Sequence, residues 1–299
     1  MSPASAHRAG YVALLGWTNV GKSTLLNRLV GTKLAAVADK AQTTRTRIMG
    51  VRTFPDRGQI VFLDTPGVHQ PRYRMNRAMV RISKEAMRAA DLVALVVDAA
   101  RGAGPGDASV AGWLRGAEGR VLAVLNKVDL VKPKSRLLPI IETVSGEWGI
   151  PEVVPVSAHT GDGCELLLER LLAGLPEGPP LFPEDTLTDQ PERVLAAEWI
   201  REKILAETWQ ELPHATAVVV DRWSAREDGL LEIEASILVD RDSQKKIVIG
   251  TGGELLKRVG TTAREELERL LDRRVMLRLW VRVRRDWRND PRFLSELGL

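Results

Sequence analysis

The chain has 299 residues, 44% of them hydrophobic, and carries a net charge of +4 at pH 7. This length suits two domains, and the composition excludes a largely disordered protein. The single cysteine, Cys164, excludes an intrachain disulfide and favours a reducing compartment, and its simplest role is that of a small buried side chain. No apolar run approaches the roughly 18 residues of a membrane span, and residues 1–10 lack the apolar core of a signal peptide, so we expect a cytoplasmic protein.

Residues 8–175 alternate apolar runs with helical segments. The runs begin at Tyr11, Ile60, Leu92, Val121 and Val153. Continuous apolar runs separated by helical stretches are typical of parallel strands that helices cover on both faces. We therefore predict an α/β domain with a doubly wound, mostly parallel sheet. Polar motifs follow four of these runs directly, and this is the edge where such sheets bind ligands.

A glycine-rich motif follows the first run: Gly16-Trp17-Thr18-Asn19-Val20-Gly21-Lys22-Ser23-Thr24. Its backbone N–H groups can surround a phosphate at the start of a helix near Lys22. The pattern Gly-x4-Gly-Lys-Ser predicts that Lys22 meets the β- and γ-phosphates and that Ser23 binds Mg²⁺. The loop thus predicts a nucleoside phosphate but does not select its base.

Two further segments complete the predicted phosphate and magnesium site. Asp64, in Asp64-Thr65-Pro66-Gly67, ends an apolar run and would hold Mg²⁺ through water, while the Gly67 N–H would reach the γ-phosphate. Thr43 and Thr44 lie about twenty residues after the glycine-rich loop, and their spacing does not choose between them as a magnesium ligand. Both polar loops would be ordered by the γ-phosphate and released on hydrolysis.

The segment Asn126-Lys127-Val128-Asp129 selects the base. The Asp129 carboxylate can accept hydrogen bonds from the ring N–H and the amino group of guanine, a donor pair that adenine lacks. We therefore predict GTP and GDP as ligands. This motif argues against a metabolic phosphotransferase, and intact Lys22, Ser23 and Asp64 argue against an RNA-binding protein whose nucleotide domain is merely structural.

A proline-rich segment, residues 176–191, predicts a stiff linker to a second domain at residues 192–299. There the patterns predict a helix, two strands, two helices and a strand, with Gly250-Thr251-Gly252-Gly253 between the paired helices. A Gly-x-x-Gly turn by itself equally describes one helix end followed by another helix start. However, residues 241–299 hold 15 Lys and Arg against 9 Asp and Glu, so we expect a polyanion to bind here.

Basic residues gather around this turn and on the last predicted strand. Those around the turn are Lys245, Lys246, Lys257 and Arg258. The turn itself carries no positive charge, and Glu254 follows it, which weakens its attraction for phosphate. The exposed face of the last strand would present Arg278, Trp280, Arg282 and Arg284. Arginines beside an aromatic ring suit phosphate contact and base stacking, although a charged edge strand that resists aggregation has the same pattern.

From Tyr11 to the final segment, residues 289–299, the chain resembles the Era-type ribosome-assembly GTPases of the translation-factor-related class. Besides the motifs above, Gln42-Thr43-Thr44-Arg45 matches the family pattern Gln-Thr-Thr-Arg. The resemblance assigns magnesium binding to Thr44, guanine contacts to the backbone of Ser157 and Ala158, and a position along the base to Lys127. It also implies that the second domain is a smaller α+β, type II KH domain, whose glycine turn contacts about four nucleotides of single-stranded RNA.

The resemblance further implies a GTPase that forms GDP and phosphate and acts as a timing switch, with Lys22, Thr44 and Gly67 at the reacting phosphate. Its RNA would be the 3′ end of 16S rRNA during assembly of the 30S subunit. A monomer in the cytoplasm, in part peripheral at the inner face of the membrane, is expected. Val68 stands where better-known switch proteins carry a glutamine that orients water, which predicts slow intrinsic hydrolysis. Asn19 would either hold an activating potassium ion or only brace the loop.

Overall fold

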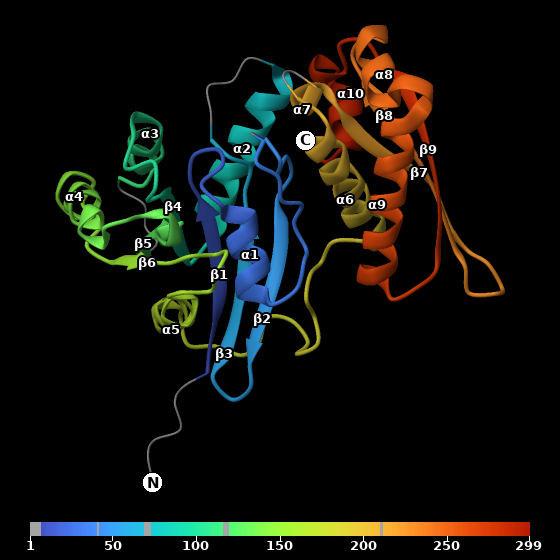
Figure 1. Ribbon diagram of the computed structural model, residues 1–299. Helices are drawn as coiled ribbons and strands as arrows, with labels where there is room; N and C mark the ends of the chain where they lie inside the picture. The colour runs from blue at the N-terminus through green and yellow to red at the C-terminus, as the bar shows by residue number, and fades with distance from the viewer. Residues whose placement is uncertain (1–6, 41, 69–72, 116–119, 210–211) are drawn as a thin grey trace. The chain divides into compact units, whose positions relative to one another are not determined.

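The structure, a computed structural model, describes residues 7–40, 42–68, 73–115, 120–209 and 212–299 (Figure 1). These residues group into two compact units. The first comprises Met1–Leu34, Thr44–Pro71 and Asn76–Asp189, and the second comprises Ala35–Thr43, Arg72–Met75 and Gln190–Leu299. Two short segments of the N-terminal half therefore belong to the second unit by their contacts. No helix among the described residues is both long and apolar enough to cross a membrane.

The first unit contains a six-stranded sheet in the order β2-β3-β1-β4-β5-β6. Its strands are β1 (Arg8–Leu15), β2 (Ile48–Phe54), β3 (Gly58–Asp64), β4 (Leu92–Asp98), β5 (Arg120–Asn126) and β6 (Val153–Pro155). All neighbours pair in parallel except β2, which is antiparallel to β3. Strands β3 and β4 are buried along their whole length, as expected for strands with helices on both faces.

Helices cover both faces of this sheet. They are α1 (Lys22–Val30), α2 (Arg74–Ala89), α3 (Pro105–Trp113), α4 (Leu137–Glu142) and α5 (Cys164–Gly174). Helices α1 and α5 pack on each other; α1 also packs on β2 and β3, and α5 packs on β1 and β3. Helix α1 lies in front of the sheet in Figure 1. On the opposite face, Ala86 of α2 packs against β2 and β3, and Val110 of α3 packs against β4 and β5.

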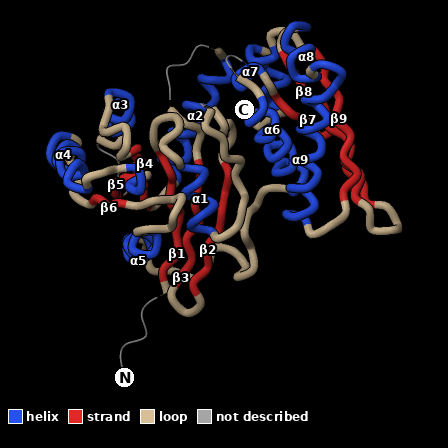
Figure 2. Tube along the Cα trace, in the orientation of Figure 1, coloured by secondary structure: helices blue, strands red, loops and turns tan. Residues whose placement is uncertain are grey.

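The second unit contains a three-stranded sheet in the order β7-β8-β9 (Figure 2). Its elements are α6 (Glu192–Glu207), α7 (Leu212–Ala215), β7 (Ala217–Ala225), β8 (Leu231–Val239), α8 (Asp242–Ile249), α9 (Glu254–Leu271), β9 (Val275–Val283) and α10 (Pro291–Glu296). Strand β8 is antiparallel to β7 and parallel to β9. Helices α6, α8 and α9 bury their apolar faces against this sheet in one core. The C-terminal segment is fixed by Trp287, which is fully buried and donates from Nε1 to the Ala215 carbonyl oxygen at 3.0 Å.

The proline-rich segment is bonded to the first sheet. Buried Gln59 accepts from the N–H groups of Leu181 and Phe182 at 2.9 Å each. The Val51 N–H donates to the Leu187 carbonyl oxygen at 2.8 Å, and the Thr188 hydroxyl donates to the Met49 carbonyl oxygen at 2.7 Å. The segment therefore runs along the edge strand β2 up to its last few residues.

The predicted fold class is confirmed: a doubly wound, mostly parallel sheet precedes a smaller α+β unit. Strand β2 and helix α10 were not predicted from the sequence. In β2 the apolar residues are interrupted by Gly50 and Arg52, so the run is too broken to stand out as a buried strand. Helix α10 has only six residues, and the one local sign of its start is the Asp290 N-cap, whose side chain accepts from the N–H groups of Arg292 and Phe293.

Candidate nucleotide site and RNA-binding surface

The glycine-rich loop connects β1 to α1. Gly21 ends the loop at φ 94°, and a Cβ there would lie 2.3 Å from Nδ2 of Asn126, so only glycine fits. The buried Nζ of Lys22 donates to the carbonyl oxygens of Gly16 and Trp17, at 3.2 and 3.0 Å. Burial lowers the pKa of Lys22 to about 8. A cation is thus enclosed by a loop at a helix N-terminus, an arrangement that favours a phosphate.

Three oxygen-bearing side chains meet beside Lys22. Ser23 Oγ lies 2.6 Å from Thr44 Oγ1 and donates to Asp64 Oδ2 at 2.7 Å, and Thr44 Oγ1 lies 3.3 Å from the same carboxylate oxygen. The other oxygen, Asp64 Oδ1, is buried and has no hydrogen-bond partner within the described chain. Burial raises the pKa of Asp64 to about 6. Hydroxyl and carboxylate oxygens are the hard ligands that Mg²⁺ prefers, so these residues fit a magnesium ion.

The structure separates the two neighbouring threonines. Thr44 belongs to the oxygen cluster, whereas the Thr43 hydroxyl donates to the Lys40 carbonyl oxygen at 2.7 Å. The structure therefore favours Thr44 over Thr43 as a magnesium ligand, whereas the spacing in the sequence did not choose between them.

Gly67 and Val68 lie against the glycine-rich loop. A Cβ on Gly67 would lie 2.8 Å from Thr18 Cα, so the backbone approaches the loop more closely than a side chain would allow. The Val68 N–H donates to the Gly16 carbonyl oxygen at 3.2 Å. The Val68 side chain is buried in the apolar cluster that contains Leu95 and Val110. It therefore contributes to the core and offers no polar atom to a water molecule.

Asn126 ties the phosphate loop to the Ser157–Ala158 loop. Its Nδ2 donates to the Val20 carbonyl oxygen at 2.9 Å, and its Oδ1 accepts from the Ala158 N–H at 2.9 Å. Ser157 is fully buried, and its backbone N–H donates to the Asp162 carbonyl oxygen. One amide thus holds together two segments that the sequence places more than a hundred residues apart.

Lys127 and Asp129 flank the same loop. The Lys127 Nζ donates to the Asn19 carbonyl oxygen and to Asp98 Oδ2, both at 2.7 Å. Asn19 and Lys127 both adopt left-handed backbone conformations, with φ of 61° and 65°, which is backbone strain of the kind that collects at functional sites. The Asp129 Oδ1 is buried without a hydrogen-bond partner in the described part of the chain. That acceptor suits the N–H groups of a guanine edge.

Two residues that brace this site were missed from the sequence. Asp98 ends the buried strand β4 and pairs with Lys127, and Arg28 of α1 donates from Nε to the Ala158 carbonyl oxygen at 3.1 Å. Asp98 could have been predicted from the sequence, because it ends an apolar run in the same way as Asp64 does. Arg28 carried none, since a basic residue in the last turn of a helix is common.

The glycine turn of the second unit separates α8 from α9. Gly250, Gly252 and Gly253 all have positive φ, at 77°, 59° and 83°. Around Gly252 and Gly253 a Cβ would meet no atom within 4 Å, and Thr251 is exposed. The turn therefore projects an uncovered backbone that a polymer can approach.

A groove of about 430 Å³ begins at this turn, between α9 and β9. Lys257 and Arg264 contribute positive charge to it, and Leu277 and Leu279 form its apolar side. Lys246 is exposed on α8, and Arg258 pairs with Glu207 at 3.0 Å. Arg264 was not among the predicted residues, although it lies two helical turns after Lys257 and so on the same face of α9.

The basic residues of β9 lie on the other side of the strand. Because Leu277 and Leu279 line the groove, the alternating Arg278, Trp280 and Arg282 project from the opposite face, where all three are exposed. Arg278 pairs with Glu234 at 3.3 Å, and Arg284 pairs with Asp290 at 2.8 Å. An exposed face of the last strand was predicted for Arg278, Trp280 and Arg282, and the structure places this face opposite the groove beside the glycine turn.

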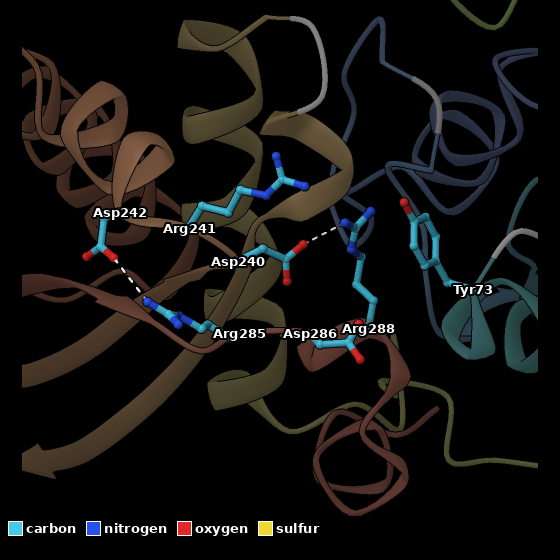
Figure 3. Close-up of a pocket in the computed structure, with 7 residues that line it drawn as sticks. All are labelled: Tyr73, Asp240, Arg241, Asp242, Arg285, Asp286 and Arg288. Atoms are coloured by element: carbon cyan, nitrogen blue, oxygen red, sulfur yellow. Dashed lines mark ion pairs between the residues drawn. The ribbon is translucent and has the colours of Figure 1, made fainter.

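A second hollow, of about 400 Å³, lies at the start of α8 (Figure 3). Its charges are matched: Asp240 pairs with Arg288 at 2.6 Å, and Asp242 lies 3.9 Å from Arg285. Asp286 and Arg241 complete the balance. With equal numbers of acidic and basic side chains, this hollow attracts a phosphate backbone less than the groove beside Lys257.

Comparison with known proteins agrees with both units. The model of a family described as 50S ribosome-binding GTPases matches residues 11–127, and a KH domain model matches residues 211–288. The chain is 49% identical to the GTPase Era of Geobacter metallireducens over 292 residues, which cover 97% of each chain. It is 46% identical to the GTPase Era of Lacticaseibacillus paracasei over 294 residues. The chain belongs to the Era family. It is therefore a GTP hydrolase with a KH domain.

Solved Era structures resemble the chain over nearly its full length. One, determined with MgGDPNP and nucleotides 1506–1542 of 16S rRNA, has a TM-score of 0.95 and 41% identity and covers 98% of this chain and 99% of that one. An Era variant from Aquifex aeolicus, bound to GDP and AlF4⁻, has a TM-score of 0.94 and 41% identity, with coverage of 97% and 99%. The Era fold therefore extends over both units.

Proposed function

We propose that this GTPase binds GTP and GDP with Mg²⁺ through the residues of the first unit identified above. The phosphates would lie along Gly16, Asn19 to Thr24 and Gly67, with Lys22 at the β- and γ-phosphates. Mg²⁺ would be held by the hydroxyls of Ser23 and Thr44 and, through water, by Asp64. Bound Mg²⁺ would supply positive charge at the phosphoryl oxygens. The guanine would lie against Lys127, Ser157 and Ala158. The unpartnered Oδ1 of Asp129 supports the choice of guanine.

We propose that intrinsic hydrolysis is slow. In this site Lys22, Thr44 and the Gly67 N–H stabilise charge on the reacting phosphate, and Val68, which is buried and apolar, leaves the attacking water without a side-chain partner. Asn19 has an exposed side chain, and its carbonyl is already bonded to Lys127. This backbone contact supports a role for Asn19 in bracing the glycine-rich loop. The alternative proposal is that the Asn19 side chain holds an activating potassium ion, which predicts faster turnover in potassium than in sodium.

We propose that the RNA bound by the second unit is the 3′ end of 16S rRNA and that the protein acts in assembly of the 30S subunit. The full-length likeness to an Era structure determined with nucleotides 1506–1542 carries this proposal. A single strand would follow the turn at residues 250–253 and the groove beside Lys257, with Lys245, Lys246 and Arg258 near its phosphates. Arg278, Trp280, Arg282 and Arg284 would contact a further part of the same RNA.

The domain boundaries that we propose are residues 8–175 for the G domain, 176–191 for the linker and 192–299 for the KH domain. We further propose a monomer that works in the cytoplasm, with part of it at the inner face of the membrane. Sedimentation would test the monomer, and fractionation of cells would test the two locations.

Crosslinking of the full-length protein to RNA, with GDP and with GDPNP, tests the central proposal. Sequencing of the crosslinked fragments should recover the 3′ end of 16S rRNA, with more in GDPNP than in GDP. Crosslinks spread evenly over ribosomal RNA would contradict the proposed RNA, and equal recovery in both nucleotides would contradict the switch.

A further inference from the structure

Strands β4 and β5 end side by side at the edge of the first sheet that carries the nucleotide motifs. They pair in parallel, with Asp98 opposite Asn126, and the Ala99 N–H donates to the Asn126 carbonyl oxygen at 2.9 Å. Lys127, the next residue of the chain, has a left-handed backbone with φ of 65°. Its Nζ lies 2.7 Å from Asp98 Oδ2. The register of the two strands therefore brings an acidic residue at the end of one to the lysine that follows the other.

The Asp98 carboxylate is fixed by its own turn. Its Oδ1 accepts from the backbone N–H groups of Ala100 and Arg101, at 3.0 and 3.2 Å, where the chain leaves β4. The residue is buried, with 8% of its surface exposed. A buried carboxylate that accepts backbone hydrogen bonds through one oxygen presents the other oxygen in a fixed direction. Asp98 Oδ2 is therefore a rigid acceptor for the ammonium group of Lys127.

Lys127 connects this carboxylate to the glycine-rich loop. Its Nζ also donates to the Asn19 carbonyl oxygen at 2.7 Å. A Cβ on Gly21 would lie 3.9 Å from Lys127 Cε, so the lysine stem runs beside the loop. A free lysine side chain adopts many rotamers, and ordering it costs conformational entropy. Two fixed acceptors, one at the end of β4 and one in the loop, hold this side chain in one place before a nucleotide binds.

We propose that Asp98 is a positioning residue for guanine nucleotides: it holds the Lys127 side chain along the base and, through that lysine, the loop backbone at Asn19. This inference rests on the proposed position of Lys127 against the guanine. It assigns a part in nucleotide binding to the end of β4, which none of the five nucleotide motifs contains. Because Lys127 lies at the base and not at the γ-phosphate, Asp98 affects the affinities for GDP and GTP equally and does not affect the rate of hydrolysis.

Asp98→Asn in the full-length protein tests this role. The amide has nearly the shape of the carboxylate, but it is neutral and replaces one acceptor oxygen by a donor. We expect the Kd values for GDP and for GDPNP, both with Mg²⁺, to rise about tenfold each, the size of a lost charge-assisted hydrogen bond. The single-turnover rate at saturating GTP should change less than about twofold. Wild-type affinities, or a rise in Kd for GDPNP alone, would overturn the proposal.

Asp91→Asn is the matched control. Asp91 directly precedes β4, at the opposite end of the strand from Asp98, and its Oδ2 accepts from the Tyr11 N–H at 2.7 Å. The same substitution is thus made beside the same strand, at the edge of the sheet away from the nucleotide motifs. Both Kd values should stay as in wild type. Equal losses of affinity in Asp91→Asn and Asp98→Asn would overturn the proposal, because general destabilisation of β4 would then explain them.

A double-mutant cycle with Lys127→Ala separates positioning from a general structural effect. Lys127→Ala should weaken both nucleotides at least as much as Asp98→Asn does. Once Lys127 is alanine, Asp98→Asn should add less than about twofold. A full tenfold loss in that background would overturn the proposal, because Asp98 would then act without Lys127. Wild-type affinity in Lys127→Ala would instead contradict the proposed position of Lys127 along the base and, with it, this inference.

Asp98→Ser replaces Asp98→Asn if the asparagine variant does not fold. A serine hydroxyl can accept from the N–H groups of the turn, but it is too short to reach Lys127. This variant must weaken GDP and GDPNP binding to the same extent. Wild-type affinity in folded Asp98→Ser would overturn the proposal.

Discussion

The nucleotide site and the glycine turn are built in opposite ways. In the nucleotide site, Lys22 and Asp64 are buried. Asn126 and Lys127 donate hydrogen bonds to backbone carbonyl oxygens of the glycine-rich loop and so hold it in place. In the glycine turn, Gly252 and Gly253 have empty space around them. An enclosed, braced site is preorganised for one small ligand, whereas an open turn lets a long polymer pass. Substitutions should therefore have larger effects on nucleotide chemistry than on RNA affinity.

The largest effect is expected at the reacting phosphate. Lys22→Ala and Thr44→Ala each remove a contact that stabilises charge, so the single-turnover rate of GTP hydrolysis should fall about 10²- to 10³-fold. Val68→Ala should change this rate by less than about threefold, because the side chain belongs to the core, although it should lower thermal stability. A loss in Val68→Ala as large as in the other two would give Val68 a catalytic role.

Base selection is the next largest effect. Asp129→Asn replaces one acceptor oxygen by a donor, so GTP affinity should fall about 100-fold while relative affinity for xanthosine triphosphate rises, since xanthine carries an acceptor at position 2. Competition binding with both nucleotides measures the change. An unaltered preference for GTP would remove Asp129 from the base site.

A double substitution in the glycine turn sharpens the comparison. Thr251→Asp with Gly252→Asp places two negative charges where the RNA backbone should pass, and aspartate tolerates the positive φ of Gly252 better than most residues. Affinity for single-stranded RNA of the 16S 3′ end should fall more than about tenfold. Intrinsic GTP hydrolysis should stay at the wild-type rate. Wild-type RNA affinity would exclude the turn as the RNA contact.

The buried titratable pair predicts a pH dependence of magnesium binding. The pKa of Asp64 is raised to about 6 by burial, so below pH 6 a proton occupies the carboxyl group and competes with Mg²⁺. The half-saturating Mg²⁺ concentration should rise toward tenfold per pH unit below 6. Above pH 8, loss of the proton from Lys22 should weaken phosphate binding. Titrations of GDPNP binding with Mg²⁺ from pH 5 to 9 measure both effects. In Asp64→Asn the half-saturating Mg²⁺ concentration should no longer rise as the pH falls below 6.

The smallest effects are expected at Arg282 of β9 and at Arg284, which follows the strand. Arg282→Ala and Arg284→Ala should each weaken RNA binding a few-fold and make the slope of log affinity against log salt shallower by about 0.7 per lost phosphate contact. Arg284 already pairs with Asp290 and lies 3.9 Å from the Phe293 ring centre, so its loss should also lower stability. Salt titrations with labelled RNA separate the two variants. If the slope of log affinity against log salt were unchanged in both variants, these arginines would not contact phosphates, and their role would be to protect an edge strand from aggregation.

The sequence predicted the elements and motifs that depend on local patterns. The apolar runs located five strands of the first sheet, and the helix predicted at the start of the second domain is α6, Glu192–Glu207. Contacts between distant segments left little trace in the sequence. Examples are the bond from Asn126 to the phosphate loop, the pairing of Asp98 with Lys127, and the packing of residues 35–43 on α6. Such contacts depend on chain topology, which single-residue patterns do not encode.

The proline-rich segment also protects the sheet from self-association. An edge strand with unpaired N–H and C=O groups is a template for another molecule, and β2 forms one edge of the first sheet. Bonds from Val51 to Leu187 and from Thr188 to Met49 occupy part of that edge, while the opposite edge strand, β6, is three residues long and ends in Pro155. A fragment that ended at Leu175 would keep every nucleotide motif and expose the β2 edge, so it should aggregate where one that ends at Asp189 stays monomeric.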